Sequence, residues 1–162
     1  MSKAVMLSIR PKWCEKIANG EKTIEVRKTK PRLDTPFKCY IYCTLPKYPH
    51  EDFIATDYPR PQFYGGGKVV GEFTCDRIYE LAPLNHAPDD VEKQACLTRE
   101  EIVNYLKGTG YGWHISDLRI YDQTRELGEF RKPEFPTGLR LEDDEIKRPP
   151  QSWCYVDDLQ TK

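Results

Sequence analysis

The pattern of apolar and polar residues predicts a chain built mainly of short strands. Apolar runs or strict alternation mark six candidate strands, at residues 4–9, 22–28, 37–43, 68–81, 113–121 and 152–157. In the second of these, Ile24 and Val26 share one face, which predicts a half-buried strand. In the third, alternate residues are expected to face the core and the solvent: Phe37, Cys39, Ile41 and Cys43 inward, and Lys38, Tyr40 and Tyr42 outward. The fourth is long and is expected to bend at Gly71.

A helix is predicted between the first two strands. Pro11 has a fixed φ that suits a first helical position, and Asn19-Gly20 supplies a left-handed stop. Between these ends, Cys14, Ile17 and Ala18 form an apolar stripe that would pack against the core.

A second helix is predicted to begin after Thr98. Thr98 and Glu101 have the spacing of a capping box, and Leu97 can contact Ile102 across it. Its apolar face would consist of Ile102, Tyr105 and Leu106.

The order of these elements predicts an α+β protein. Few helices stand between strands to cover a parallel sheet, so a small, mostly antiparallel β-barrel fits best. The 162 residues suit a single domain, residues 1–162. Two Pro-rich segments interrupt the pattern, at about 44–67 and 128–151. The first carries five aromatic residues, which favour a packed flap, and the second contains the acidic run 142–145, which favours a surface excursion.

The net charge of −1 conceals a strong asymmetry along the chain. Residues 1–38 hold ten Lys and Arg against four acidic residues, which gives +6, and the remainder carries −7. A polyanion would be attracted to the first strands and repelled by the rest of the chain. This asymmetry favours a polyanion as the partner, and the alternative is that charges clustered along the sequence do not gather on one face of the folded chain.

Composition also limits the compartment and the chemistry. No apolar stretch approaches a membrane span, and Ser8 and Arg10 interrupt the N-terminal run, so neither a membrane nor a signal peptide is expected. We therefore expect a cytoplasmic protein, as a monomer, with six reduced cysteines. Their spacing lacks C-x-x-C, so no metal is expected, and no Walker, Rossmann or zinc-protease pattern indicates a cofactor.

The most informative stretch is Gly20-Glu21-Lys22-Thr23-Ile24-Glu25-Val26-Arg27, which follows Leu7-Ser8-Ile9-Arg10-Pro11 and the first predicted helix. These segments resemble the ASCH signature, in which a first strand and helix lead to G-x-K-x-x-E-x-R on the second strand. Lys22, Glu25 and Arg27 occupy its three polar positions. The resemblance is firm over residues 4–43 and looser at 69–78 and 111–120. It implies a PUA-like β-barrel whose basic cleft handles RNA or a nucleotide.

The spacing within this motif is chemically sensible. Glu25 and Arg27 share a strand face with α-carbons about 6.5 Å apart, so they could pair or diverge around a ligand. Lys22 could reach a phosphate or a developing negative charge with a flexible ammonium. A carboxylate beside two cations could act as a base or accept hydrogen bonds from a nucleobase. The alternative is that Glu25 and Arg27 form only an ion pair at the barrel rim.

Other side chains could complete such a site. Ser8 and Arg10 stand at the end of the first strand. Aromatic rings that could stack on a base belong to Trp13, Tyr42, Tyr64 and Trp113, and core packing is the alternative for each, favoured for Trp113. By resemblance to ASCH proteins that cleave RNA, a basic motif residue and a late-strand serine would form the functional pair, Lys22 and Ser116. His114 could then carry the proton.

A related reaction is disfavoured by the motif itself. Other ASCH relatives hydrolyse acetylated cytidine with a Lys, a Thr nucleophile and a Glu. Here Glu25 stands where the Thr of K-x-x-T-x-R would be. Thr23 could replace it only if the strand register slipped, which its alternation discourages.

Three functions remain open. The first is binding of RNA or a modified nucleotide in a basic cleft, by Ser8, Arg10, Trp13, Arg27, Tyr42, Tyr64 and His114. The second is hydrolysis of single-stranded RNA or deacylation of a modified nucleoside, with Lys22, Glu25 and Ser116 as catalytic residues. The third is a protein-interaction domain that uses the Pro-rich loops. Binding is favoured, because a fold supports a site more directly than a particular reaction.

Overall fold

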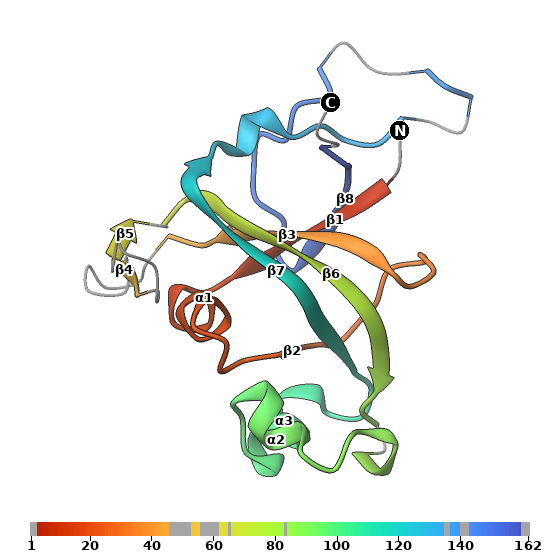
Figure 1. Ribbon diagram of the computed structural model, residues 1–162. Helices are drawn as coiled ribbons and strands as arrows, with labels where there is room; N and C mark the ends of the chain where they lie inside the picture. Colours follow the sequence, from red (N-terminus) through yellow and green to blue (C-terminus); the bar gives the residue numbers. More distant parts are fainter. Residues whose placement is uncertain are drawn as a thin grey trace.

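A curled six-stranded sheet forms the centre of the molecule (Figure 1). The computed structural model describes residues 3–45, 53–55, 62–64, 66–82, 84–134, 137–139 and 143–159, without the side chains of 53–55 and 62–64. The strands of the sheet are β1 (Lys3–Ile9), β2 (Ile24–Arg27), β3 (Phe37–Cys43), β6 (Lys68–Glu80), β7 (Tyr111–Arg125) and β8 (Trp153–Asp157). All six predicted strands are therefore present, with small differences at their ends.

The sheet is mixed, and its two edge strands, β2 and β8, form no backbone ladder with each other among the described residues. The order of the strands is β2-β7-β6-β3-β1-β8. β1 and β3 run parallel, and the other neighbours run antiparallel. A bulge beside Gly71 bends β6, as the sequence predicts. The α+β class and the PUA-like architecture are confirmed, but the described strands make a half-barrel rather than a closed barrel.

The helices lie at one side and one end of this sheet (Figure 1). α1 (Pro11–Ala18) has Pro at its start and Asn19 as its C-cap, and Gly20 follows with φ of 83°. α3 (Arg99–Leu106) begins with the predicted capping box. The short α2 (Val91–Ala95) precedes it and was not predicted, because five residues are too few to show a helical period.

Part of the first Pro-rich segment forms a second, two-stranded sheet. β4 (Phe53–Ala55) pairs antiparallel with β5 (Gln62–Tyr64), and β4 lies beside α1. The packing of aromatic side chains predicted for this flap lies outside the described residues.

Both faces of the sheet are buried, which corrects the prediction for β3. Tyr40 and Tyr42 were expected in solvent, yet they are 1% and 6% exposed. They pack in a cluster with Phe130 and Ile146, which come from the second Pro-rich segment. Asp144, in the acidic run of that segment, is 3% exposed and accepts a 2.8 Å hydrogen bond from Arg131. The segment therefore covers the sheet as well as meeting solvent.

The prediction of a half-buried β2 is also wrong, for a similar reason. Ile24 and Val26 pack on one side against α2 and α3, in a cluster that includes Ala95 and Ile102. On the other face, Glu25 and Arg27 are 6% and 8% exposed. The polar motif thus lies within the protein wall and not on an open strand face.

Candidate functional site

A cleft of about 1020 Å³ lies between the end of β1, α1, β2, α3 and the segment that precedes β8. Among its lining residues are seven that the sequence singled out: Ser8, Arg10, Trp13, Lys22, Glu25, Arg27 and Tyr42. Further walls come from Thr44 and Leu45, from Glu101, Asn104 and Tyr105 of α3, and from Pro149, Pro150 and Gln151. The signature motif and the cleft therefore coincide.

Lys22 is almost fully buried in the cleft wall, at 2% exposure. Its Nζ donates a 2.6 Å hydrogen bond to the backbone oxygen of Ala95 and lies 4.9 Å from the centre of the Trp13 ring. Burial lowers the pKa of Lys22, while the negative charge of Glu25 opposes that shift. Lys22 is therefore a fixed, desolvated ammonium, and not the flexible one expected from the sequence. Two of its three N–H groups donate to no described residue, which leaves them for a ligand.

Arg27 connects the two edges of the half-barrel. From β2, its guanidinium donates to the backbone oxygen and the hydroxyl of Ser152, both at 3.1 Å, just before β8. It also donates to the backbone oxygen of Ser8 in β1, at 2.7 Å. Most of its donors are thus engaged within the protein. Arg27 closes the gap between the edge strands, so its role is at least partly structural.

Glu25 carries a buried oxygen with no partner. Its Oε1 lies 3.8 Å from Nε of Arg27, which is too long for a normal hydrogen bond. Its Oε2 is buried and accepts no hydrogen bond from any described residue. An unpaired, desolvated acceptor costs roughly 1–3 kcal/mol, and more when it is charged. In a cleft wall, such an atom would bind an N–H group of a ligand strongly.

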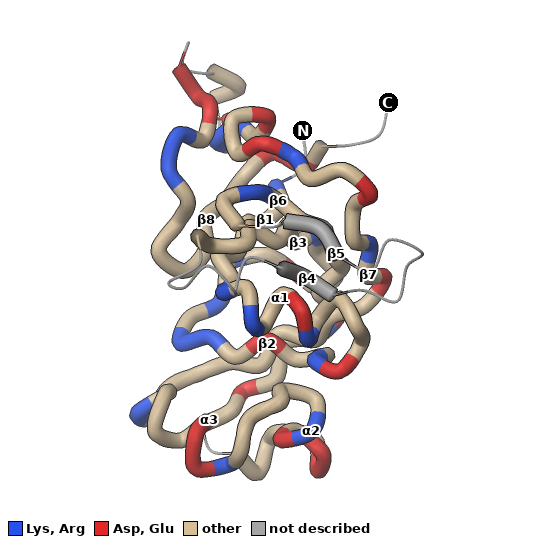
Figure 2. Tube along the Cα trace, turned by 90° about the vertical axis from the view of Figure 1, so that its left-hand side faces the viewer, with Lys and Arg blue, Asp and Glu red and all other residues tan. Residues whose placement is uncertain are grey.

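Cations surround the cleft without acidic partners among the described residues. Arg10 lines the cleft. The ammonium of Lys12 lies 4.7 Å from the centre of the Trp13 ring, and that of Lys28 lies 5.1 Å from the centre of the Tyr105 ring. All three cations are exposed. Figure 2 shows Lys and Arg along the flank at the level of β2, with Asp and Glu on α2 and α3. Part of the basic N-terminal charge thus gathers at this rim.

The aromatic residues of the site differ from the predicted set. Trp113 is fully buried in the core, as favoured from the sequence. Trp13 lines the cleft, but its ring already contacts the ammonium groups of Lys12 and Lys22. Tyr105 was assigned to an apolar helix face, yet it is 46% exposed and lines the cleft. The helical periodicity of the sequence gives no signal that would tell whether the Tyr105 side chain packs in the core or lines the cleft.

Three further predicted residues are not placed in the cleft. Ser116 and His114 are not among the described residues that line it. On β7, Ser116 donates a 2.8 Å hydrogen bond to the backbone oxygen of Thr74, and His114 Nδ1 lies 2.6 Å from Asp76 Oδ1. They alternate with Trp113 and Ile115, which point into the core, and so lie on the opposite strand face. The side chain of Tyr64 lies outside the described residues.

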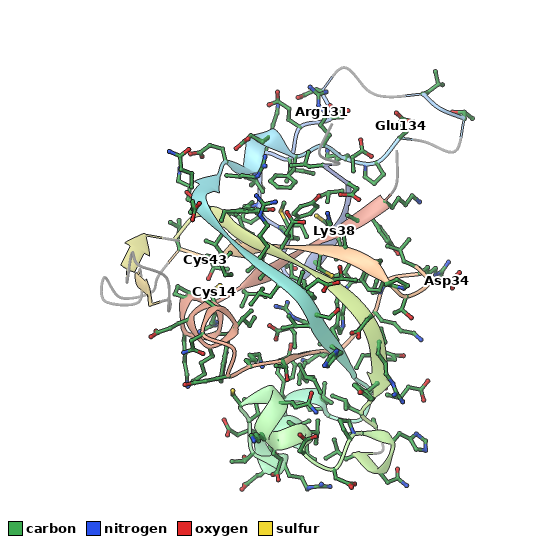
Figure 3. The ribbon with its side chains drawn as sticks, viewed as in Figure 1. Cys14, Asp34, Lys38, Cys43, Arg131 and Glu134 are labelled. Atoms are coloured by element: carbon green, nitrogen blue, oxygen red, sulfur yellow. The ribbon has the colours of Figure 1, made fainter. Side chains whose placement is uncertain are left out.

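Two buried thiols, Cys14 of α1 and Cys43 at the end of β3, lie close to each other (Figure 3). Burial raises the pKa of Cys14 well above its usual value, and a hydrogen bond with Cys43 raises it further. All six cysteines are free. Since a thiolate is the reactive form, Cys14 is a poor candidate for a nucleophile at neutral pH.

The curled mixed half-barrel and its few short helices are consistent with the PUA-like ASCH fold. Solved structures of an ASCH protein from Zymomonas mobilis share it. A Tyr-to-Phe variant of that protein has a TM-score of 0.63 and 17% identity, over 96% of this chain and 91% of that one. The unsubstituted form has a TM-score of 0.62 and 18% identity, over 95% of this chain and 87% of that one.

Other comparisons are negative. No family model matches the chain, and no curated protein matches it. At these identities the solved structures establish the fold, which confirms the architecture implied by the sequence motif. Within the described residues, no helix combines the length and the apolar character needed to cross a membrane.

Proposed function

We propose that this chain is an ASCH-family protein that binds RNA or a nucleotide in the cleft, with the base at Glu25 and the phosphate at the rim. The observation that carries this proposal is the buried, unpartnered Oε2 of Glu25. The residues that we assign to binding are Glu25, Lys22 and Arg10, which line the cleft, and Lys12 and Lys28, which contact the lining rings of Trp13 and Tyr105.

The charges decide the orientation of the ligand. A phosphate beside Glu25 would meet a carboxylate in a desolvated wall and would be repelled. An N–H group of a nucleobase would instead satisfy Oε2, and the free N–H groups of Lys22 could donate to a neighbouring base carbonyl. The exposed cations at the rim can meet the phosphate, with a binding energy that depends on salt.

Binding of labelled single-stranded RNA of random sequence, measured by fluorescence anisotropy at two salt concentrations, tests this proposal. We expect Glu25→Gln and Lys22→Met each to weaken binding about tenfold or more, since each removes a buried interaction worth at least about 1.4 kcal/mol. Glu80→Gln and Lys93→Met are matched controls on exposed residues that do not line the cleft, and should bind as wild type. Affinity indifferent both to salt and to the two cleft variants would refute the proposal.

A stability measurement separates binding from folding. Lys22→Met removes a charge that is costly to bury, and leaves the backbone oxygen of Ala95 without that donor. These effects oppose each other, so its free energy of unfolding should stay within about 1 kcal/mol of wild type.

Hydrolysis of RNA or of a modified nucleoside is the second candidate function. It is favoured by one observation, the lowered pKa of Lys22 beside Glu25 in a cleft, since catalytic groups often have perturbed pKa values. Lys22 and Glu25 would then have to act without Ser116 and His114. Turnover of single-stranded RNA or acetylated nucleosides that is lost in Glu25→Gln would support it. If no substrate of such a panel is turned over, with or without divalent metal, hydrolysis is excluded and binding remains the proposed function.

A further inference from the structure

β8 is an edge strand, with β1 on one side and no described strand paired on the other. The backbone groups of successive residues in a strand point alternately to its two sides. The backbone N–H of Ser8 in β1 donates to the backbone oxygen of Ser152 at 3.0 Å, just before β8 begins, and this bond fixes the alternation. Cys154 and Val156 therefore bond to β1, and the residues between them direct their N–H and C=O groups to the free side.

The free side of β8 is covered at one end only. There the backbone N–H of Asp157 donates to the backbone oxygen of Arg131 at 2.9 Å, which confirms the direction of the alternation. Trp153 and Tyr155 face the same side, and the backbone N–H and C=O of neither residue bond to any described residue. These donors and acceptors stand in the order that one more strand would satisfy.

A hollow of about 470 Å³ borders this part of β8. It is lined by Cys154 and Tyr155 of β8, and most of its other lining belongs to the segment 143–150. The Cys154 side chain packs against the cluster that contains Ile146, whereas the Tyr155 ring lies on the opposite face, 5.3 Å from that of Trp153. Because the hollow meets both residues, it reaches the edge of the strand between the two faces.

The opposite wall of the hollow cannot pair with β8 in place of a partner. Pro150 lines both this hollow and the cleft, so the stretch Pro149-Pro150-Gln151 forms a ridge between them. The two prolines have no backbone N–H to donate. The backbone oxygen of Pro150 accepts a 2.6 Å hydrogen bond from the hydroxyl of Ser8 on the cleft side. The ridge is thus held away from the open groups of β8.

We propose that this hollow is a docking slot for an extended peptide segment of another protein, which adds one strand to the free side of β8. Alternating N–H and C=O groups match another peptide backbone, and this mode of recognition is known as strand addition. The segment 143–150 walls the slot on its far side, which admits a single chain but obstructs the sheet edge of a second folded copy. Alternate peptide side chains would lie on the Cys154 face, where Ile146 and Pro150 favour an apolar residue.

Selection of a displayed library of random octapeptides on the full wild-type chain tests the slot, with affinities then measured on two variants. Tyr155→Pro removes an N–H that β1 does not use, in an edge strand that tolerates proline in this orientation. Tyr155→Ala loses the same ring but keeps the N–H, and is the matched control. We expect the selected peptides to bind Tyr155→Pro about five- to tenfold less tightly than Tyr155→Ala, which should stay within about threefold of wild type.

A second measurement needs no variant and applies even if Tyr155→Pro fails to fold. When the tightest peptide is added to wild type, the NMR amide signals of Trp153 and Tyr155 should shift and exchange more slowly with solvent. Those of Cys154 and Val156, which already bond to β1, should change little. Methylation of one alternate set of peptide nitrogens should weaken binding about tenfold or more, and methylation of the other set should be tolerated.

Several outcomes would overturn the slot. They are a library that yields no binder, equal affinity for the two Tyr155 variants, and equal effects of the two methylated sets. Dimerisation that rises with concentration and is lost in Tyr155→Pro would identify a second copy as the occupant, and the peptide proposal would then be wrong. None of these measurements depends on the cleft, so the slot and the proposed function stand or fail separately.

Discussion

Lys22, Glu25 and Arg27 belong to one motif but have different partners. Arg27 donates to the backbone oxygens of Ser8 and Ser152, and Lys22 donates to that of Ala95. Glu25 alone keeps a buried oxygen that no described residue satisfies. A residue whose hydrogen bonds are satisfied internally contributes chiefly to stability, and one left unsatisfied is better suited to a ligand. Substitutions at Arg27 and Glu25 should therefore affect different properties.

We predict that Arg27→Ala lowers the free energy of unfolding by about 3 kcal/mol, because it removes hydrogen bonds across the sheet edges and a charge next to buried Glu25. Urea denaturation followed by circular dichroism measures this loss. Arg32→Ala is the matched control, since the Arg32 side chain is exposed and should contribute less than about 0.5 kcal/mol. Equal stability of the two variants would show that the bridge between β2 and β8 is not stabilising.

At the scale of single elements, α3 joins a local signal to the site. Thr98 accepts a hydrogen bond from the backbone N–H of Glu101, and the Glu101 carboxylate accepts one from that of Thr98, each at 3.1 Å. The helix that begins there carries Asn104 and Tyr105 into the cleft wall. The capping box therefore holds part of the site in position.

We predict that Thr98→Ala costs about 1 kcal/mol of stability and increases hydrogen exchange in the first turn of α3, because the backbone N–H of Glu101 loses its acceptor. Thr98→Ser keeps the hydroxyl and should retain most of the stability. Exchange measured by mass spectrometry on the peptide covering α3 checks the local effect. Unchanged protection in Thr98→Ala would mean that packing of Ile102 and Leu106, and not the cap, fixes the helix.

The elements that the sequence predicts are those whose signals are local. Apolar runs or alternation locate all six strands of the sheet, and residues at the helix ends locate α1 and α3. Partners far apart along the chain are not predictable in this way: Ala95 is 73 residues from Lys22, and Ser152 is 125 residues from Arg27. The same limit explains why Tyr40 was expected in solvent, since the residues that cover it belong to the distant segment around Phe130.

At the scale of the whole molecule, several thiols are buried by the packed sheet. Burial raises the pKa of Cys14 and Cys39 well above the usual value, that of Cys75 to about 12 and that of Cys154 to about 11. In the unfolded chain these thiols would ionise at a pH of about 8.5. A raised pKa in the folded state means that the stabilisation is complete below that pH and is lost as the pH rises towards the folded values.

We predict that the free energy of unfolding falls above a pH of about 8.5, by up to about 1.4 kcal/mol per pH unit for each such thiol. The lowered pKa of Lys22 makes the free energy of unfolding rise with pH, but this is one group against the four thiols. Urea denaturation between pH 7 and 10, with a reductant present, measures the slope. Cys39→Ala should flatten the slope whatever its effect on stability at neutral pH. A free energy that is constant from pH 8 to 10 would contradict this prediction.

β1 pairs with β8, so the first described strand and the last share one ladder. The bond from Ser8 to Pro150, which anchors the ridge beside the cleft, spans 142 residues. On a ribosome, β1 leaves the exit tunnel long before residues 150–157 have been made, and its edge has no neighbour on that side during the interval. The wall of the cleft formed by residues 149–151 is consequently assembled only after residues 150–157 have left the exit tunnel, and a nascent chain that lacks it cannot hold RNA in the manner proposed.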